Sequence, residues 1–237
     1  MSPLLVIMPA YNEEAAIAPV VKAWSIVLSA VVPDHTLYVL NDGSKDGTLA
    51  KLRSLEKEMP NLKVVDKQNT GHGPTCVEGY TLALREGADW ILQIDSDGQC
   101  DPCYFESLWR LREKHPVIYG FRRKREDGML RLFISRCISV LIVLSCGVWV
   151  RDSNVPYRLM RRDALLKALP NIPADFSLAN ILLSVFQESQ TGITWVPIVF
   201  RTRTGGVSSM KMRTFLPHAR ALMSQLRRSS RLLRRTA

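Results

Sequence analysis

Residues 90–103, Trp-Ile-Leu-Gln-Ile-Asp-Ser-Asp-Gly-Gln-Cys-Asp-Pro-Cys, form an apolar run that ends in two closely spaced carboxylates. The run from Trp90 to Ile94 has the length and β-branched content of a short buried strand. Asp95 and Asp97 follow where this strand ends. Carboxylate oxygens in that position suit a hard cation such as Mg²⁺ or Mn²⁺, which in turn holds phosphate oxygens. Taken alone, the same residues also suit a solvated Asp-Ser-Asp-Gly turn.

Three strand-like segments precede this one and alternate with helix-like segments. The predicted strands cover residues 4–8, 36–40, 62–65 and 90–94. Such alternation indicates an α/β fold with a mostly parallel central sheet and helices on both faces. Ligands of these sheets bind outside the carboxyl ends of the strands. We therefore expect the loops at Pro9, Asn41 and Asp95 to meet in one crevice. Because no glycine-rich phosphate loop follows the first strand, a nucleotide bound there would need a metal ion for its phosphates.

The composition is that of an ordinary globular protein with a strongly basic end. Of 237 residues, 46% are hydrophobic and 23% are charged. The net charge of +10 arises after residue 200, where ten Lys and Arg stand without Asp or Glu. The start of the chain lacks a secretory signal, so we expect reduced thiols and a cytoplasmic location. Cys100 and Cys103 have zinc-like spacing, but no second pair accompanies them.

Four loop motifs occur in a familiar order. They are Pro9-Ala10-Tyr11-Asn12-Glu13-Glu14, Asn41-Asp42-Gly43-Ser44-Lys45-Asp46-Gly47-Thr48, the Asn69/Gly71/Gly73 loop and Asp95-Ser96-Asp97-Gly98-Gln99. Together they resemble the family-2 glycosyltransferases of GT-A fold, over roughly residues 3–210. Within that family the chain is similar to the branch of dolichol-phosphate mannose synthase and the bacterial polyprenyl-phosphate glycosyltransferases. The resemblance implies an inverting enzyme with a GDP- or UDP-linked sugar donor.

The resemblance assigns the nucleoside to the first two loops. Pro9, Ala10, Tyr11 and Glu13 would border the base and ribose, and Asp42 would accept hydrogen bonds from the nucleoside. Tyr11 and Glu13 also suit a plain helix entry, where Glu13 would favour the positive end of the helix dipole. These residues are therefore candidates for donor binding.

The resemblance assigns the metal ion to the loop after the fourth strand. Asp95 would lie towards the ribose, with an oxygen near the ion, while Asp97 and Gln99 would be metal ligands. A divalent cation there, Mg²⁺ or Mn²⁺, neutralises the charge that develops on the leaving nucleoside diphosphate.

Acceptor residues are expected in the second half of the chain. A strand over 117–121 ends in four consecutive cations, and the resemblance places Arg122 against an acceptor phosphate. A solvated basic loop is the alternative. Asp152 opens a segment similar to the family's Asp-x-x-x-Gly-Phe-Arg, although Pro156 stands where Gly is usual. Asp152 would be the base for a hydroxyl acceptor, or a structural residue bonded to Arg158 or a backbone amide. A phosphate acceptor needs no strong base.

The most apolar segment lies at residues 130–150. Its uncharged part, residues 137–150, is shorter than the ~20 residues that a spanning helix requires. We expect a buried or membrane-surface helix, with Arg136 meeting lipid or acceptor phosphate at the interface.

A glycine-bearing loop follows the last predicted strand, at 195–200. It resembles the family's Arg-x-x-Gly-x-Ser segment, whose Arg closes on the diphosphate. Arg203 would have this catalytic role, with Ser208 and Lys211 assisting. The alternative is an exposed loop after an edge strand.

Residues 211–237 are expected to form a basic tail behind a catalytic domain at 1–210. From Phe215 a helix would carry an apolar stripe on one side and arginines on the other. The stripe comprises Phe215, Ala219, Leu222, Leu226 and Leu233. Such a helix is typical of binding to an anionic membrane surface. A nucleic acid is not expected as a partner, and a solvated or oligomer-packing helix is the other alternative.

These observations predict transfer of a sugar to a polyprenyl phosphate by an enzyme attached peripherally to the cytoplasmic face of the membrane. One alternative is transfer to a hydroxyl of a cell-surface glycan. Another is a weakly active membrane-docking subunit that works with a membrane partner or as a homo-oligomer. The sequence leaves the sugar and the nucleotide open.

Overall fold

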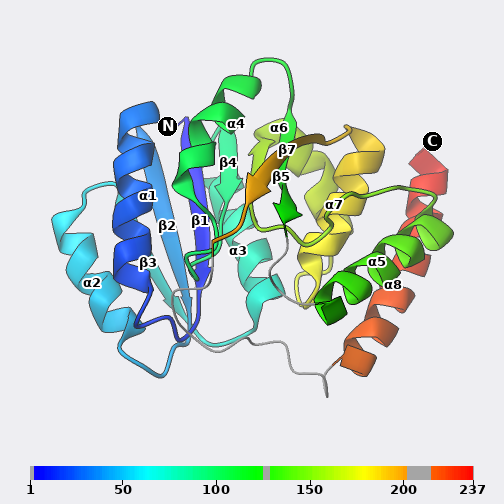
Figure 1. The fold of residues 1–237 in the computed structure, drawn as a ribbon, viewed down its shortest axis with the longest axis horizontal. Coiled ribbons are helices and arrows are strands. Elements are labelled where there is room, and N and C mark those ends of the chain that lie inside the picture. Colours follow the sequence, from blue (N-terminus) through cyan, green and yellow to red (C-terminus); the bar gives the residue numbers. More distant parts are fainter. Residues whose placement is uncertain (1–2, 125–128, 202–214, 237) are drawn as a thin grey trace.

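A seven-stranded sheet forms the centre of the protein in the computed structural model, which describes residues 3–124, 129–201 and 215–236 (Figure 1). The strand order is β3-β2-β1-β4-β6-β5-β7. The strands are β1 (Leu4–Ala10), β2 (His35–Asp42), β3 (Leu62–Lys67), β4 (Trp90–Gln93), β5 (Val117–Lys124), β6 (Arg158–Arg161) and β7 (Thr194–Val199). All are parallel to one another except β6, which pairs antiparallel with both β4 and β5. The predicted mostly parallel α/β sheet is confirmed.

Helices cover both faces of the sheet. They are α1 (Ile17–Val31), α2 (Thr48–Glu58), α3 (His72–Arg85), α4 (Phe105–Leu111), α5 (Met129–Cys146), α6 (Arg162–Ala168), α7 (Ala179–Gln190) and α8 (Phe215–Thr236). Two 3₁₀ turns cover Pro102–Tyr104 and Leu169–Asn171. Helices α1 and α4 lie in front of the sheet and α3, α6 and α7 behind it, while α5 and α8 pack together beside α7 (Figure 1).

Strand β1 lies between β2 and β4 and is buried along all seven residues. A parallel strand with helices on both faces needs such a continuous apolar run. On the α1 side the core is aromatic, since the ring of Trp24 meets Phe105 and Tyr157 edge to face. This packing holds β1 in the middle of the sheet, so the positions of the polar loops that follow β1, β2 and β4 are fixed by the core.

The carboxyl ends of β1, β2, β4 and β5 lie at the same edge of the sheet, the lower edge in Figure 1. In the register, Ala10 is opposite Asn41 on β2, and Ile7 is opposite Gln93 on β4. Because β6 runs the other way, its first residue, Arg158, lies opposite Gln93 at this edge. The predicted convergence of the loops is therefore confirmed. The reversed strand β6 was not foreseen.

Helix α8 packs its apolar stripe inside the protein. Leu222, Leu226 and Leu233 are buried, and α8 lies against α5 and α7. This differs from the expectation that the stripe faces lipid. Among the arginines of α8 whose exposure the structure describes, Arg227, Arg228 and Arg231 are all exposed. In the part of the chain that the structure describes, no helix is both long and apolar enough to span a bilayer.

Candidate functional site

Asp95 and Asp97 lie just beyond the end of β4, in the middle of the carboxyl edge. The backbone of this loop stays attached to β1, because the amide of Ile94 donates to the carbonyl of Ile7 at 3.1 Å. The Gln93 side-chain amide donates to Asp95 Oδ1 at 3.2 Å. Asp97 Oδ1 accepts from the amide of Gln99 at 3.0 Å. The loop thus holds two carboxylates next to each other at the end of a buried strand.

The surroundings of Asp95 disfavour its charge. Burial raises the pKa of Asp95 to about 6, and the neighbouring Asp97 carboxylate adds to this increase. Three cations lower the pKa of Asp95 in opposition to burial. They are His72, whose Nε2 lies 3.8 Å from Asp95 Oδ1, Arg158 and Arg122. Two neighbouring carboxylates of this kind favour a bound cation, which would stabilise the ionised form of both.

The donor set fits a divalent ion that also contacts the substrate. Mg²⁺ usually binds to one or two carboxylates and completes its shell with phosphate oxygens and water. Asp95 and Asp97 supply such a pair, whereas no group of three or more His, Cys, Asp or Glu forms a ready-made cage among residues 3–124, 129–201 and 215–236. The side chain of Gln99 contacts the carbonyl of Arg201 at 3.4 Å, so its role as a ligand stays a prediction.

His72 is a polar residue of the site that sequence reasoning missed. It is the first residue of α3, and its Nε2 lies 3.6 Å from Cys76 Sγ and 3.5 Å from Asn180 Nδ2. Attraction to the Cys76 sulfur raises the pKa of His72 to about 10, and Asp95 adds to this increase. Burial alone would lower the pKa of His72. Asp95 is the carboxylate that His72 faces, at 3.8 Å. The available signal was a titratable side chain between two loop glycines.

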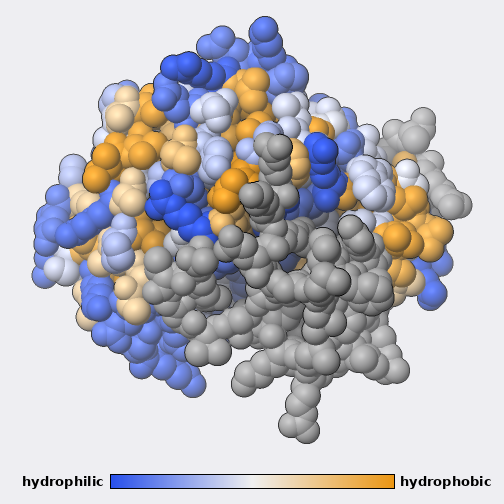
Figure 2. Space-filling view, in the orientation of Figure 1, coloured by the Kyte–Doolittle hydropathy of each residue, from blue (hydrophilic) through white to orange (hydrophobic). Residues whose placement is uncertain are grey.

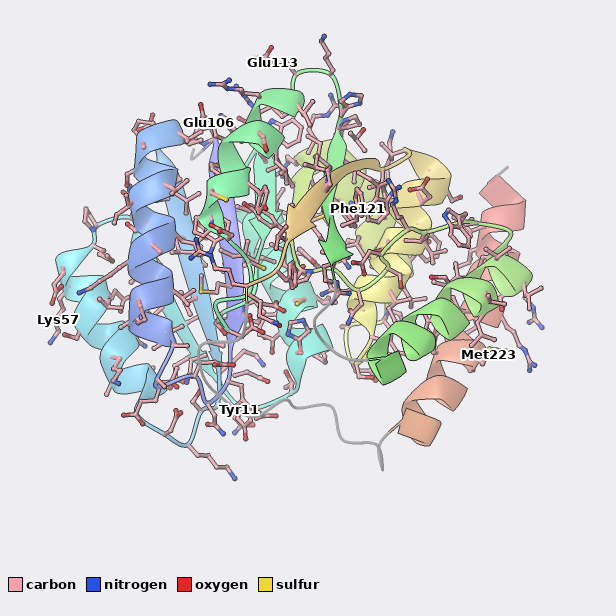
Figure 3. All side chains as sticks on the ribbon, viewed as in Figure 1. Tyr11, Lys57, Glu106, Glu113, Phe121 and Met223 are labelled. Carbon is pink, nitrogen blue, oxygen red and sulfur yellow. The ribbon has the colours of Figure 1, made fainter. Side chains whose placement is uncertain are left out.

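The loop after β1 is tied to the loop after β2. The amide of Asn12, at a positive φ of 54°, donates to Ser44 Oγ at 3.0 Å, and the amide of Glu13 donates to Thr48 Oγ1 at 2.9 Å. These bonds hold Tyr11 at the carboxyl edge, where its ring is exposed (Figure 3). Pro9, Ala10 and Glu13 are buried beside it. The structure therefore brings the four predicted nucleoside residues to one place.

Asp42 organises the loop that follows β3. Its Oδ1 accepts from Lys67 Nζ and from the amide of Thr70, both at 2.8 Å, and its Oδ2 accepts from the amide of Gly71 at 2.9 Å. Burial alone would raise the pKa of Asp42, but these hydrogen bonds outweigh it and lower the pKa. The observed contacts of the carboxylate are thus internal to the protein. Its predicted contact with a nucleoside stays a prediction.

Arg122 and Asp152 form an ion pair on the far side of Asp95. Arg122 Nε donates to Asp152 Oδ2 at 2.8 Å and Nη2 donates to Oδ1 at 2.7 Å. The two side chains are 16% and 4% exposed, and the guanidinium also lies 5.3 Å from the centre of the Phe200 ring. A bidentate pair of this kind is strong and fixes the plane of the guanidinium. The structure thus brings together the two predicted acceptor residues.

Arg158 is fully buried and bonds to backbone carbonyls. Its Nε donates to Val155 O at 2.6 Å, its Nη2 to Ser153 O at 2.9 Å and its Nη1 to Asn180 O at 2.8 Å. Of the two structural alternatives for Asp152, the bond to Arg158 is therefore replaced by a different arrangement, whereas a backbone amide, that of Arg122, does donate to Asp152 Oδ2, at 3.4 Å. Arg158 shapes the loop after Asp152, and Arg122 binds the Asp152 carboxylate.

Four predicted residues cannot be placed in the site. Arg203, Ser208 and Lys211 lie outside the described residues, and so does the side chain of Arg136 on α5. Their assigned roles stay predictions. The described part of the candidate site therefore consists of the carboxylates after β4, the loops after β1 and β2, and the Arg122–Asp152 pair.

Comparisons with known proteins concern the family and the fold of the chain. A family model described as Glycosyl transferase family 2 matches residues 5–174. The dodecaprenyl-phosphate galacturonate synthase of Rhizobium johnstonii is 28% identical over 68% of this chain and 48% of its own length. The undecaprenyl-phosphate mannosyltransferase of Micrococcus luteus is 26% identical over 87% of each chain. The chain thus spans about half the length of some curated relatives that it matches.

Solved structures with low sequence identity have the same fold. The glucosyl-3-phosphoglycerate synthase of Mycobacterium tuberculosis, crystallised with Mn²⁺, UDP-glucose and phosphoglyceric acid, superposes with a TM-score of 0.66. It is 20% identical, and the match covers 94% of this chain and 78% of the synthase chain. A second crystal of that synthase holds Mg²⁺ and UDP. Together with the family match, the sheet order and the two aspartates after β4, these findings show that the chain belongs to glycosyl transferase family 2 and has the GT-A fold.

Proposed function

We propose that this chain is a metal-dependent, inverting glycosyltransferase that moves a sugar from a GDP- or UDP-linked donor to a polyprenyl phosphate. In this reaction an acceptor phosphate oxygen bonds to the anomeric carbon of the sugar as the bond to the nucleoside diphosphate breaks. The names of the relatives that act on dodecaprenyl and undecaprenyl phosphate support this acceptor class.

The donor half of the proposal depends on the loops after β1 and β4. Tyr11 and Glu13 would border the nucleoside, and Asp95 and Asp97 would hold Mg²⁺ or Mn²⁺. The ion, when bound, would neutralise charge on the leaving diphosphate. Arg203, Ser208 and Lys211 would close on the diphosphate from the segment outside the described residues. The metal ions bound to the synthase of the same fold are consistent with such a site.

The observation that carries the acceptor half is the ion pair between Arg122 and Asp152. Both carboxylate oxygens of Asp152 accept hydrogen bonds from Arg122, so the carboxylate serves to orient a cation. A phosphate acceptor is already an anion at neutral pH and needs a cation to hold it more than a base to activate it. A hydroxyl acceptor would need the opposite, namely a carboxylate within reach of the hydroxyl proton. The arrangement favours phosphate.

A transfer assay tests the acceptor class. The full chain would be incubated with Mn²⁺, a panel of labelled GDP- and UDP-sugars, and either polyprenyl phosphate or a glycan with free hydroxyls. We expect a labelled product that extracts into butanol and appears with the lipid alone. A water-soluble product formed on the glycan, with none on the lipid, would overturn the phosphate proposal.

We also propose that the enzyme docks on an anionic membrane through α5 and α8. The exposed apolar side chains at this end include Val140, Val143, Leu144, Trp149 and Leu232, with Leu144 at 78% and Trp149 at 65% exposure. Figure 2 shows hydrophobic surface at the right-hand end, where Figure 1 draws α5 and α8. Apolar side chains next to exposed arginines are typical of helices that lie on anionic bilayers.

Vesicle flotation tests this docking surface. The variant Leu144→Asp should reduce binding to vesicles that contain anionic lipid, because it places a carboxylate where the apolar side chain would enter the bilayer. Ile26→Asp is the matched control, since Ile26 on α1 is 71% exposed but far from α5 in the fold. Equal binding of the two variants would contradict docking through α5.

A further inference from the structure

A chain of buried hydrogen bonds runs beneath the site, from Asp95 to the loop after Asp152. Gln93, at the end of β4, donates from Nε2 to Asp95 Oδ1 at 3.2 Å. Its Oε1 accepts from the hydroxyl of Tyr80 on α3 at 3.3 Å. The same hydroxyl lies 2.9 Å from Oδ1 of Asn180 at the start of α7. All three relaying side chains are buried.

The chain continues to the acceptor side through the backbone of α7. The carbonyl of Asn180 accepts from Arg158 Nη1 at 2.8 Å. Arg158 in turn donates to the carbonyls of Ser153 and Val155, which lie one and three residues after Asp152. The ladder between β4 and β6 places Gln93 opposite Arg158, so both ends of this series of hydrogen bonds belong to one rigid piece of sheet.

The chemistry of the amides fixes the direction of these bonds. An ionised carboxylate only accepts, so Gln93 must turn its NH₂ group towards Asp95. Its Oε1 then needs a donor, and the hydroxyl of Tyr80 supplies one. The one hydroxyl hydrogen is shared between Gln93 and Asn180. Replacing the hydroxyl by hydrogen would leave the buried oxygens Gln93 Oε1 and Asn180 Oδ1 without this hydrogen-bond donor. The Gln93 amide would then lose the bond that holds its orientation.

We propose that Tyr80 is a positioning residue, whose hydroxyl holds Gln93 in the rotamer that orients Asp95 and joins the donor aspartate to the acceptor loop. The inference rests on the proposed function in one respect, because it takes Asp95 as part of the donor site. Tyr80 itself touches neither substrate. Its effect on binding passes through Gln93 on one side and through Asn180 and Arg158 on the other.

The first test is the affinity of the full chain for a nucleoside diphosphate with Mn²⁺, measured by calorimetry. Tyr80→Phe should weaken it roughly 3- to 10-fold, the loss expected for one buried hydrogen bond. Tyr38→Phe is the matched control. It removes the phenol hydroxyl of another buried Tyr, on β2, which β1 separates from β4. Equal affinities for Tyr80→Phe, Tyr38→Phe and wild type would overturn the proposal.

A second test needs no ligand and separates this inference from the proposed function. Thermal unfolding midpoints would be measured for Tyr80→Phe, Asp95→Ala and the double variant. If Tyr80 acts on Asp95 through Gln93, the effects of the two substitutions on the unfolding midpoint should not add, because the second substitution removes an already broken connection. Additive effects would overturn the inference. If wild type fails to bind any nucleoside diphosphate, the donor proposal is overturned and the unfolding cycle alone decides the role of Tyr80.

Discussion

Replacing Asp152 by Asn distinguishes a carboxylate that orients Arg122 from one that acts as a base. The amide keeps one acceptor oxygen for Arg122 but loses the negative charge and the second acceptor. A hydrogen bond to a charged group contributes about 1.5–3 kcal/mol. One such bond of the observed pair is lost, so we expect an effect of about 2 kcal/mol on acceptor binding.

At 1.4 kcal/mol per factor of ten, this loss corresponds to an acceptor KM raised by at most about 30-fold, with kcat nearly unchanged. Loss of a general base would instead lower kcat by roughly 10²–10⁴-fold. The assay measures initial rates against polyprenyl phosphate concentration, with donor and Mn²⁺ saturating. Asp163→Asn is the control, because Asp163 forms a similar bidentate pair with Arg161 on the surface, at 49% and 52% exposure.

A fall in kcat of about 10²-fold or more, with an unchanged acceptor KM, would refute the orienting role. It would also restore Asp152 as a base and favour a hydroxyl acceptor. An Asp163→Asn enzyme that loses as much activity as Asp152→Asn would show that the effect is not specific to the site.

Three further predictions concern stability. Burial lowers the pKa of His35 below its ordinary 6.5. The contribution of the neutral imidazole to folding stability is therefore complete above pH 6.5 and is lost as the pH falls from 6.5 towards the folded pKa. NMR titration of His35 should give a pKa below 6.5, and an ordinary pKa would contradict this burial. Gly73→Ala should cost about 1–3 kcal/mol in urea unfolding, because the added Cβ would lie 2.3 Å from Phe176 O, and an unchanged midpoint would be inconsistent with this contact. Leu226→Ala should cost about 2–5 kcal/mol, whereas equal stability of Leu226→Ala and the exposed-site control Leu232→Ala would mean that α8 does not dock.

Sequence patterns were sufficient for the first half of the fold because each strand there is a continuous apolar run between polar loops. The run at Leu4–Ala10 is buried throughout, and the polar loops after β1, β2 and β4 meet as their parallel order requires. The antiparallel strand β6 was missed for a physical reason. Its four residues, Arg158–Arg161, include a buried Arg, and no local periodicity marks such a short strand.

Side-chain partners could be predicted less well than positions. Arg122 and Asp152 were both selected, but 30 positions separate them in the sequence, so nothing local indicated that they would bind each other. The apolar stripe of α8 has the same pattern whether it contacts lipid or α5. Only the tertiary structure shows that Leu226 lies against the protein core. Tyr80 and Gln93 were overlooked because a buried Tyr and Gln look like ordinary members of a helix and a strand.

The most direct test of the account is the rate at which nucleoside diphosphate is released from a nucleotide sugar in the presence of polyprenyl phosphate and Mn²⁺. Wild type and Asp97→Ala would be compared, each with and without a chelator. Asp97 lies in the loop after β4, beside Asp95, where the ion would bind. We predict release by wild type that the chelator abolishes and that Asp97→Ala lacks. Equal release by wild type and Asp97→Ala would contradict a metal-dependent glycosyltransferase at this edge of the sheet.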